Sequence, residues 1–426
     1  LIPVSAHTSD GIAQLKAEIL KQARSLQSPP KHLIPRLAVD RAFSPKGAGT
    51  VVTGTLTGQA MNKGDTLICL PERLTAHVRK VQNHNSTLES SVSGMRTALN
   101  LPDLPIKQRG KTGVCRGSLL TLPEHLSPVL TIDVQLERAA RSITGQSATS
   151  RCLKNTETVV LHHGTSRTRA RVILNGQTSL DLGEQCFAQL RLECSIAACP
   201  GDHFVIRDGA QQGTLGGGII LDASAKQRSF RTEQRANFLT LRAQSPTKSR
   251  ELILTELHKS PVLSLNNPVA NLPFTKAHLR QTIQKLVKEK KLTIRGIWII
   301  SPSWWKSMVQ KAADIVDHWH ASHTDSPAMP IGSWKSQLLN SQLPEDLVEI
   351  IEKHLLANGY VKQKDGIANE EHSLELPIRL VPFAQKILST LESGGLTPPP
   401  RVELAPDTDS QQALSYLIRS GQVVEI

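Results

Sequence analysis

The chain has 426 residues, of which 39% are hydrophobic and 20% charged, as is typical of folded globular proteins. Its length predicts roughly three or four domains, and the absence of a run of about 18 apolar residues argues against a membrane-spanning helix. The formal net charge of +13 favours a polyanionic partner over a membrane.

The amino end, LIPVSAHTSD, has no initiator methionine and no signal-peptide pattern. Because the signal-peptide pattern is missing, we expect a cytoplasmic protein. Because the initiator methionine is missing, we expect a piece of a longer chain. We also expect a monomer. Residues 1–28 predict the end of a strand, a turn and one amphipathic helix. In that helix Ile12, Leu15 and Ile19 share a face.

Residues 29–225 change to short strands with glycine-centred turns, including RLAVDRAF, GTVVTGTL, VLTIDVQL and HFVIRD. Alternating β-branched residues with a turn every eight to twelve positions predict antiparallel β-barrels or sandwiches. A break near Leu122-Pro123 divides this region into two β-barrel domains, 29–126 and 127–225.

After Asp222 the periodicity becomes helical, and KQRSFRTEQRANFLTLRAQ predicts a basic linker helix. Three similar units follow, whose ends align as LVKEKKLTIRG, LLANGYVKQKDG and LIRSGQVVEI. A helix, a tight turn and a short strand in each unit predict tandem α/β winged-helix modules. The predicted modules are 226–303 with the linker helix, 304–372, and a partial module at 373–426 that ends in a wing strand.

The segments GAGTVVTGTLTGQAMNKGDTL, TVVLHHGTSRTRARVIL and TLGGGIILD, followed by a winged-helix tail, resemble the selenocysteine-specific translation elongation factors. The resemblance implies that 29–126 and 127–225 are domains II and III of a translation factor, and that 1–28 is the end of its GTPase domain. It also implies delivery of selenocysteyl-tRNA to the ribosome at recoded UGA codons, directed by a hairpin in selenoprotein mRNA. We expect the last winged-helix unit of that family to be missing.

Members of this family bind GTP with Mg²⁺, and the PVSA segment resembles their last guanine-binding loop, with Ser5 and Ala6 facing the base. No GxxxxGK[ST] phosphate loop and no Asp-x-x-Gly occur in the chain. The NKGD sequence at 62–65 lies in a barrel turn after the SA loop, so it does not predict guanine recognition. We therefore expect no catalytic residue and no bound nucleotide in this chain alone.

The resemblance places the pocket for the aminoacyl end of tRNA at Asp40, Arg41 and Arg96. A selenol is more acidic than a thiol, whose pKa is about 8.5, so selenocysteine is an anion at neutral pH and serine is not. Fixed positive charge in a small pocket would discriminate between them. Asp40 would accept from the aminoacyl amino group, and Arg41 and Arg96 would hold the selenolate. The alternative is that Asp40 and Arg41 only pair with neighbouring residues at a barrel rim.

Residues 226–300 contain fifteen Lys and Arg against four Asp and Glu, whereas 301–426 contain ten against sixteen. Because phosphate contacts dominate RNA affinity, we expect RNA binding to centre on the basic segment. The candidates in it are Lys248, Arg250, Lys276, Arg280, Lys288, Lys290 and Lys291.

Two alternative families are compatible with the sequence. The chain could come from another translational GTPase or ribosome-binding factor, or from a winged-helix transcription regulator.

The cysteines and histidines show no metal-binding spacing. The six cysteines are scattered without a CxxC pair, and His318, His320 and His323 have no carboxylate or cysteine at ligand spacing. We therefore expect no metal site.

Overall fold

The computed structural model describes residues 1–25, 32–84, 86–140, 151–211, 213–265, 271–341, 343–395 and 397–425. The predicted boundary at 28/29 lies outside these ranges. The chain divides into two compact units, Leu1–Ser260 with Asn267–Leu286, and Pro261–Asn266 with Val287–Ile426. This division falls within the predicted first winged-helix module. None of the helices in the described ranges is long and apolar enough to cross a membrane.

The first unit opens with α1 (Ile12–Ser25), which buries none of its residues. An antiparallel sheet follows, with strand order β4-β3-β8-β1-β2-β7-β5-β6. It curls around one core that contains Leu37, Val52, Leu67 and Leu99, each fully buried. The strands are β1 (Arg36–Phe43), β2 (Val51–Thr57), β3 (Thr66–Leu70), β4 (Leu74–His77), β5 (Lys80–Asn83), β6 (Ser86–Leu88), β7 (Arg96–Asn100) and β8 (Leu119–Thr121).

The second sheet closes completely, in the order β11-β12-β14-β9-β16-β15. Its interior is filled by alternating residues such as Ile132, Val134, Val172 and Leu190, because side chains alternate across a strand. The barrel strands are β9 (Val129–Arg138), β11 (Thr158–His163), β12 (Ser166–Leu174), β14 (Gln185–Ile196), β15 (His203–Arg207) and β16 (Thr214–Asp222); β10 (Leu153–Lys154) and β13 (Ser179–Leu180) pair beside it. The β-barrel fold class predicted for this region is confirmed, with one curled sheet and one closed barrel.

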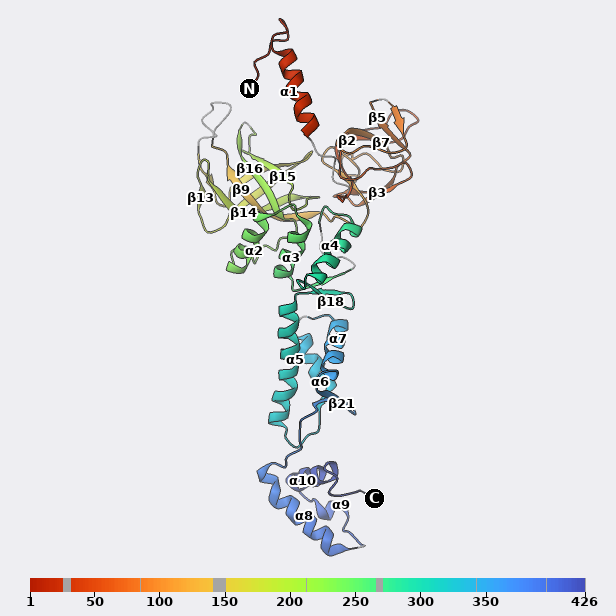
Figure 1. Cartoon of the computed structure of the whole chain (residues 1–426), viewed down its shortest axis with the longest axis vertical. Coiled ribbons are helices and arrows are strands. Elements are labelled where there is room, and N and C mark those ends of the chain that lie inside the picture. Colours follow the sequence, from red (N-terminus) through yellow and green to blue (C-terminus); the bar gives the residue numbers. More distant parts are fainter. Residues whose placement is uncertain are drawn as a thin grey trace. The chain divides into compact units, whose positions relative to one another are not determined.

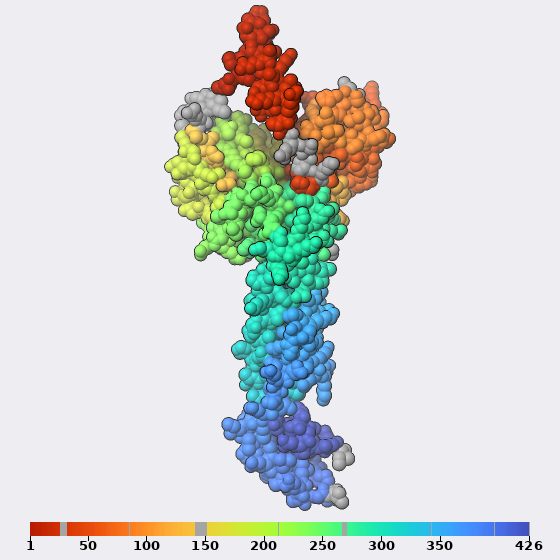
Figure 2. Space-filling model, viewed as in Figure 1, coloured from red at the N-terminus to blue at the C-terminus, as the bar shows by residue number. Residues whose placement is uncertain are grey.

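Helices α2 (Glu233–Gln244) and α3 (Ser249–Lys259) pack beside the closed barrel, α2 against β16 (Figure 1). Phe230, Phe238 and Leu239 join Ile173 and Leu221 of the barrel in one apolar cluster. In Figure 2 the green atoms of this region lie against the yellow-green barrel surface. The linker helix is shorter than predicted, because Thr232 caps its start by accepting from the backbone N–H of Arg235. Residues 226–232 form turns instead.

The second unit contains two small antiparallel sheets, β17-β19-β18 and β20-β22-β21. Trp334 is fully buried in the larger core, and its indole N–H donates to the carbonyl of Ala312 over 3.0 Å. The elements that build these parts of the second unit are β17 (Val262–Ser264), β18 (Thr293–Arg295), β19 (Trp298–Ile300), α5 (Pro302–Ser322), β20 (Met329–Pro330), α6 (Ile331–Leu339), α7 (Glu345–Leu356), β21 (Tyr360–Gln363) and β22 (Gly366–Asn369). Helix α4 (Lys276–Lys288) belongs to the first unit as far as Leu286. Each three-stranded sheet agrees with the predicted winged-helix pattern.

The end of the second unit is helical, with η2 (Ile378–Leu380), α8 (Val381–Gly394), α9 (Arg401–Leu404) and α10 (Thr408–Arg419). Leu380, Ile387 and Leu417 form its core. The wing strand predicted for QVVEI is wrong over its described residues, 422–425, which form no strand. A strand needs a hydrogen-bonded partner, and the described part of this module supplies none.

Candidate functional site

Asp40 and Arg96, two of the three residues predicted to form the aminoacyl pocket, form an ion pair on the surface of the first sheet. The register between β1 and β2 shifts between Val39 and Arg41, so Asp40 lies at a β-bulge. Arg96 donates from Nε to Oδ2 and from Nη2 to Oδ1 of Asp40, each over 2.9 Å. Such a two-pronged arrangement fixes the guanidinium plane against the carboxylate.

Thr53 completes this cluster from the neighbouring strand β2. Its hydroxyl donates to Oδ1 of Asp40 over 2.6 Å and accepts from Nη2 of Arg96 over 3.1 Å. The alternating VVTGT pattern placed Thr53 on a polar face, which is the signal that could have identified it. Asp40, Thr53 and Arg96 form what we call the rim cluster.

Hydrogen bonding from Arg96 lowers the pKa of Asp40, and the charges of Arg96 and Arg41 add to that effect against the opposing influence of burial. Asp40 is therefore an anion at neutral pH and suits a cationic ligand group. More than half of the Arg96 side chain, 54%, is exposed. Arg96 is therefore accessible to a competing anion, although it pairs with the half-buried Asp40.

Arg41 lies apart from the ion pair, in a separate hollow of about 390 Å³. This hollow is lined by Ala42, Phe43, Ile106, Val114, Cys115 and a second guanidinium, that of Arg116. Arg116 was not among the predicted pocket residues, because it stands in a turn with no strand pattern in the sequence. The structure thus joins Asp40 to Arg96 directly, whereas Arg41 affects Asp40 through its charge.

A buried ion pair fixes the first sheet to the closed barrel. Arg36 donates from Nη1 to both carboxylate oxygens of Asp202 over 2.9 Å, and His163 Nε2 lies 3.0 Å from Oδ2. Burial alone would raise the pKa of Asp202, but the charge of Arg36 and the hydrogen bond with His163 lower it to about 2. The joint therefore holds an ionised carboxylate at neutral pH.

Ser5 and Ala6 lie in the turn before α1. The backbone N–H of Ser5 donates to the carbonyl of Asp10 over 3.1 Å, and the Ser5 hydroxyl accepts from the N–H of Thr8 over 3.2 Å. Both groups of Ser5 therefore have partners within the loop. The loop does not present a free Ser5 N–H to a base.

The seven basic candidates divide between the two units. Lys248, Arg250, Lys276 and Arg280 belong to the first, and Lys288, Lys290 and Lys291 to the second. Lys276 and Arg280 share a face of α4, one turn apart. Lys276 lies 3.1 Å from Glu124, and Arg250 lies 3.5 Å from Glu251. All but Arg250 are exposed, as phosphate contacts require.

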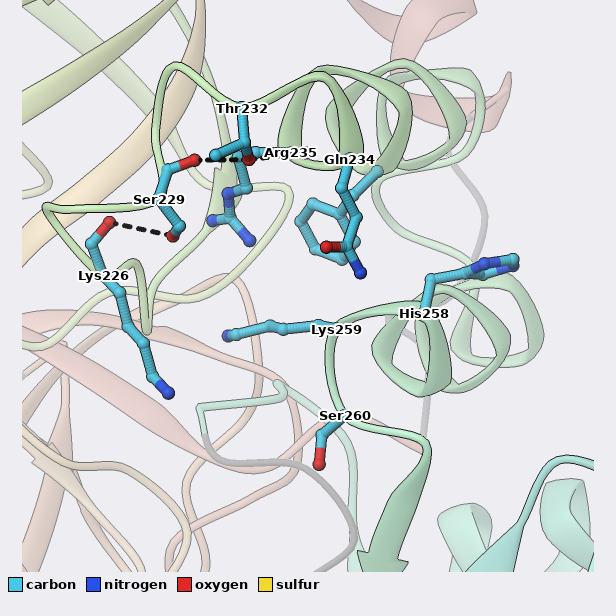
Figure 3. Close-up of a pocket in the computed structure, with 9 residues that line it drawn as sticks. Lys226, Ser229, Thr232, Gln234, Arg235, His258, Lys259 and Ser260 are labelled. Atoms are coloured by element: carbon cyan, nitrogen blue, oxygen red, sulfur yellow. Dashed lines mark hydrogen bonds between the residues drawn. The ribbon is translucent and has the colours of Figure 1, made fainter. Parts of the chain in front are cut away.

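A hollow of about 390 Å³ opens between the segment that follows the closed barrel and the end of α3 (Figure 3). Two of its cations are already neutralised by buried carboxylates. Arg235 contacts Asp133 at 2.7 Å and also pairs with Asp222, while Lys259 contacts Asp222 at 3.0 Å. This charge network therefore joins the helices to the barrel and is not a free anion site.

Comparison with known proteins agrees with this architecture. Residues 140–227 match the family described as the beta-barrel domain of selenocysteine-specific elongation factor. The chain is 26% identical over 378 residues to the selenocysteine-specific elongation factor of Haemophilus influenzae, covering 87% of this chain and 56% of that protein. It is 30% identical over 257 residues to the selenocysteine-specific elongation factor of Desulfomicrobium baculatum. That match covers 60% of this chain and 38% of that protein.

The crystal structure of a bacterial selenocysteine-specific elongation factor shares the fold, with a TM-score of 0.60 at 23% identity. The match covers 98% of this chain and 62% of that one. The chain thus spans about half the length of the relatives it matches.

Proposed function

Because the chain belongs to the family of selenocysteine-specific elongation factors, we propose that it is the tRNA- and mRNA-directed part of such a factor. In this role it helps to deliver selenocysteyl-tRNA to the ribosome at recoded UGA codons, guided by a hairpin in the selenoprotein mRNA. It acts in the cytoplasm as a monomer. The alternative of another translational GTPase is not favoured, since both relatives above are specific for selenocysteine.

The rim cluster is the observation that supports a role in recognising the aminoacyl end. The α-ammonium group of an aminoacyl ester is a cation and pairs with the ionised Asp40. That contact draws the carboxylate away from Arg96, whose guanidinium then faces the selenolate. A neutral serine hydroxyl gains much less from the same guanidinium, so charge discriminates between the two tRNAs.

In this proposal Arg41 acts on the pocket at longer range, through its charge and without contacting the ligand. Its guanidinium lies in the hollow with Arg116 and contributes positive potential near Asp40. The two arginines of the sequence-based pocket therefore act differently: Arg96 contacts the ligand and Arg41 adds to the field. Exchange of Arg41 for glutamine should weaken binding of selenocysteyl-tRNA more than binding of seryl-tRNA, but by less than Arg96→Ala, because its charge acts on the selenolate from a distance.

GTP and Mg²⁺ are the cofactors of the full-length family, and the residues present do not fit them. The chain has no phosphate loop and no Asp-x-x-Gly, and the Ser5 N–H is engaged within its own turn. The nucleotide therefore has no part in the recognition step proposed for these residues. In this proposal the 426 residues contribute recognition of RNA and of the aminoacyl group.

The test compares selenocysteyl-tRNA with seryl-tRNA, using the 426-residue chain and the rate of spontaneous ester hydrolysis as the readout. Bound ester is protected, and we expect stronger protection of the selenocysteyl ester. Arg96→Ala should reduce the preference by about tenfold, the usual weight of a charge-assisted hydrogen bond. Arg109→Ala removes an exposed arginine elsewhere on the same domain and is the control. Equal preference in Arg96→Ala and the parent chain would refute the assignment.

A further inference from the structure

Four arginines line a hollow of about 350 Å³ on the closed barrel, far along the chain from the rim cluster. Arg171 comes from β12 and Arg191 from β14, while Arg228 and Arg231 come from the turns that follow the barrel. The remaining lining residues are Thr156, Ile173, Gln227 and Phe230. No carboxylate is among the residues that line it.

Arg171 and Arg191 are directly opposite each other in the register of β12 and β14. Like charges at directly opposed positions of an antiparallel pair destabilise the sheet. In the described ranges, the lining of the hollow supplies no carboxylate to these two arginines or to Arg228 and Arg231. The fold thus places two like charges directly opposite each other at this position.

The hollow is built rigidly, because buried residues hold both of its walls. Phe230 is 1% exposed and packs against Ile173, which anchors the turns that carry Arg228 and Arg231. On the other wall, Arg191 donates from Nε to Oε1 of Gln189 over 3.0 Å. Gln189 is fully buried and is itself held by Asp133.

We propose that this hollow, the arginine hollow, binds phosphoryl groups, either backbone phosphates of an RNA or a free phosphate or pyrophosphate ion. Guanidinium forks match the oxygen geometry of phosphate, and several oxygens on one group satisfy several arginines at once. Phe230 is buried and offers no platform for stacking a base, so the hollow contacts phosphate and not nucleobase. The proposal does not depend on the aminoacyl pocket, since the two sites share no residue.

The first arm of the test measures thermal unfolding of the full chain with added pyrophosphate or chloride at equal ionic strength. All five tryptophans, Trp298, Trp304, Trp305, Trp319 and Trp334, belong to the second unit. Far-UV circular dichroism therefore follows both units, and tryptophan fluorescence is an internal control for the second. We expect pyrophosphate at a hundredfold excess over its Kd to raise the Tm of the first unit by about 5 °C.

The double variant Arg171→Gln/Arg191→Gln removes the facing charges. It should be more stable than the parent chain in chloride, because the repulsion is gone, and it should lose the pyrophosphate response. Arg228→Gln/Arg231→Gln tests the same hollow from its other wall, should the first variant fold poorly. Arg24→Gln/Arg109→Gln removes the same charge from exposed positions outside the hollow and should keep the full response.

The second arm measures binding of a fluorescent, non-aminoacylated RNA duplex over a range of salt concentrations. If RNA phosphates occupy the hollow, either hollow variant should bind about tenfold more weakly, with a salt slope reduced by about two. Loss of the pyrophosphate response with unchanged RNA binding would identify a free anion as the ligand. If both hollow variants match the Arg24→Gln/Arg109→Gln control in both arms, the proposal is wrong.

Discussion

Exchange of Arg235 for alanine should destabilise the first unit strongly, because it removes the central cation of a buried network. The Arg235 side chain is 6% exposed, and its partners Asp133 and Asp222 are 0% and 4% exposed. Removal of one partner from a buried ion pair costs about 3–5 kcal/mol, since the remaining charge is left without compensation. For a unit of this size that cost lowers the Tm by about 10 °C.

The contacts that remain in Arg235→Ala determine how the lost stability is divided between Asp133 and Asp222. Asp222 keeps Lys259 at 3.0 Å, whereas Asp133 keeps only the amide of Gln189 at 2.9 Å. Asp133 therefore carries most of the cost. A double-mutant cycle with Asp133→Asn should show this, because the neutral asparagine needs no cation, and Arg235→Ala should cost much less in that background.

The pH dependence supplies a second check with a definite sign. Burial raises the pKa of Asp133 to about 6, against the lowering effect of Arg235. A carboxyl with a raised pKa contributes stability that is present below its unfolded pKa and lost as pH rises through the folded value. Without Arg235 the pKa of Asp133 rises further, so the variant should recover stability on acidification from pH 7.5 to 5.

The assay is urea unfolding of the full chain, followed by circular dichroism and by tryptophan fluorescence. The first-unit transition should move and the fluorescence midpoint should not, because all tryptophans lie in the second unit. Gln234→Ala, an exposed neighbour on α2, should change stability by less than about 0.5 kcal/mol. A loss below about 1 kcal/mol for Arg235→Ala, or one that grows on acidification, would refute the reasoning.

Two further predictions concern each unit separately. The pKa of Asp202 is lowered to about 2, so its contribution is present above its unfolded pKa and lost as pH falls from about 4 to 2. Asp202→Asn should therefore flatten the acid unfolding curve of the first unit in that range, and an unchanged curve would contradict the role of Arg36. In the second unit, Trp334→Ala should cost about 3–5 kcal/mol through the cavity it leaves, measured by the fluorescence of the other tryptophans. A midpoint equal to that of the parent chain would show that Trp334 does not hold this core.

The sequence by itself determined the class of most elements and the kind of protein, although the strand expected at QVVEI is absent from its described residues. Strands such as β1 and β12 could be predicted because alternation of apolar and polar residues is a local property, visible within eight or nine positions. The order of barrel motifs and helical repeats was enough to indicate the family. Asp40 and Arg96 were identified through that resemblance, 56 positions apart in the chain.

Only the tertiary structure decided which charges meet. Asp133 and Arg235 are 102 positions apart, and no local pattern marks either as buried or paired. The facing arrangement of Arg171 and Arg191 depends on strand register, which a shift of one residue would abolish. Local patterns report which face of an element is apolar, but ion pairs and hollows form between distant segments, and their positions follow from how whole elements pack.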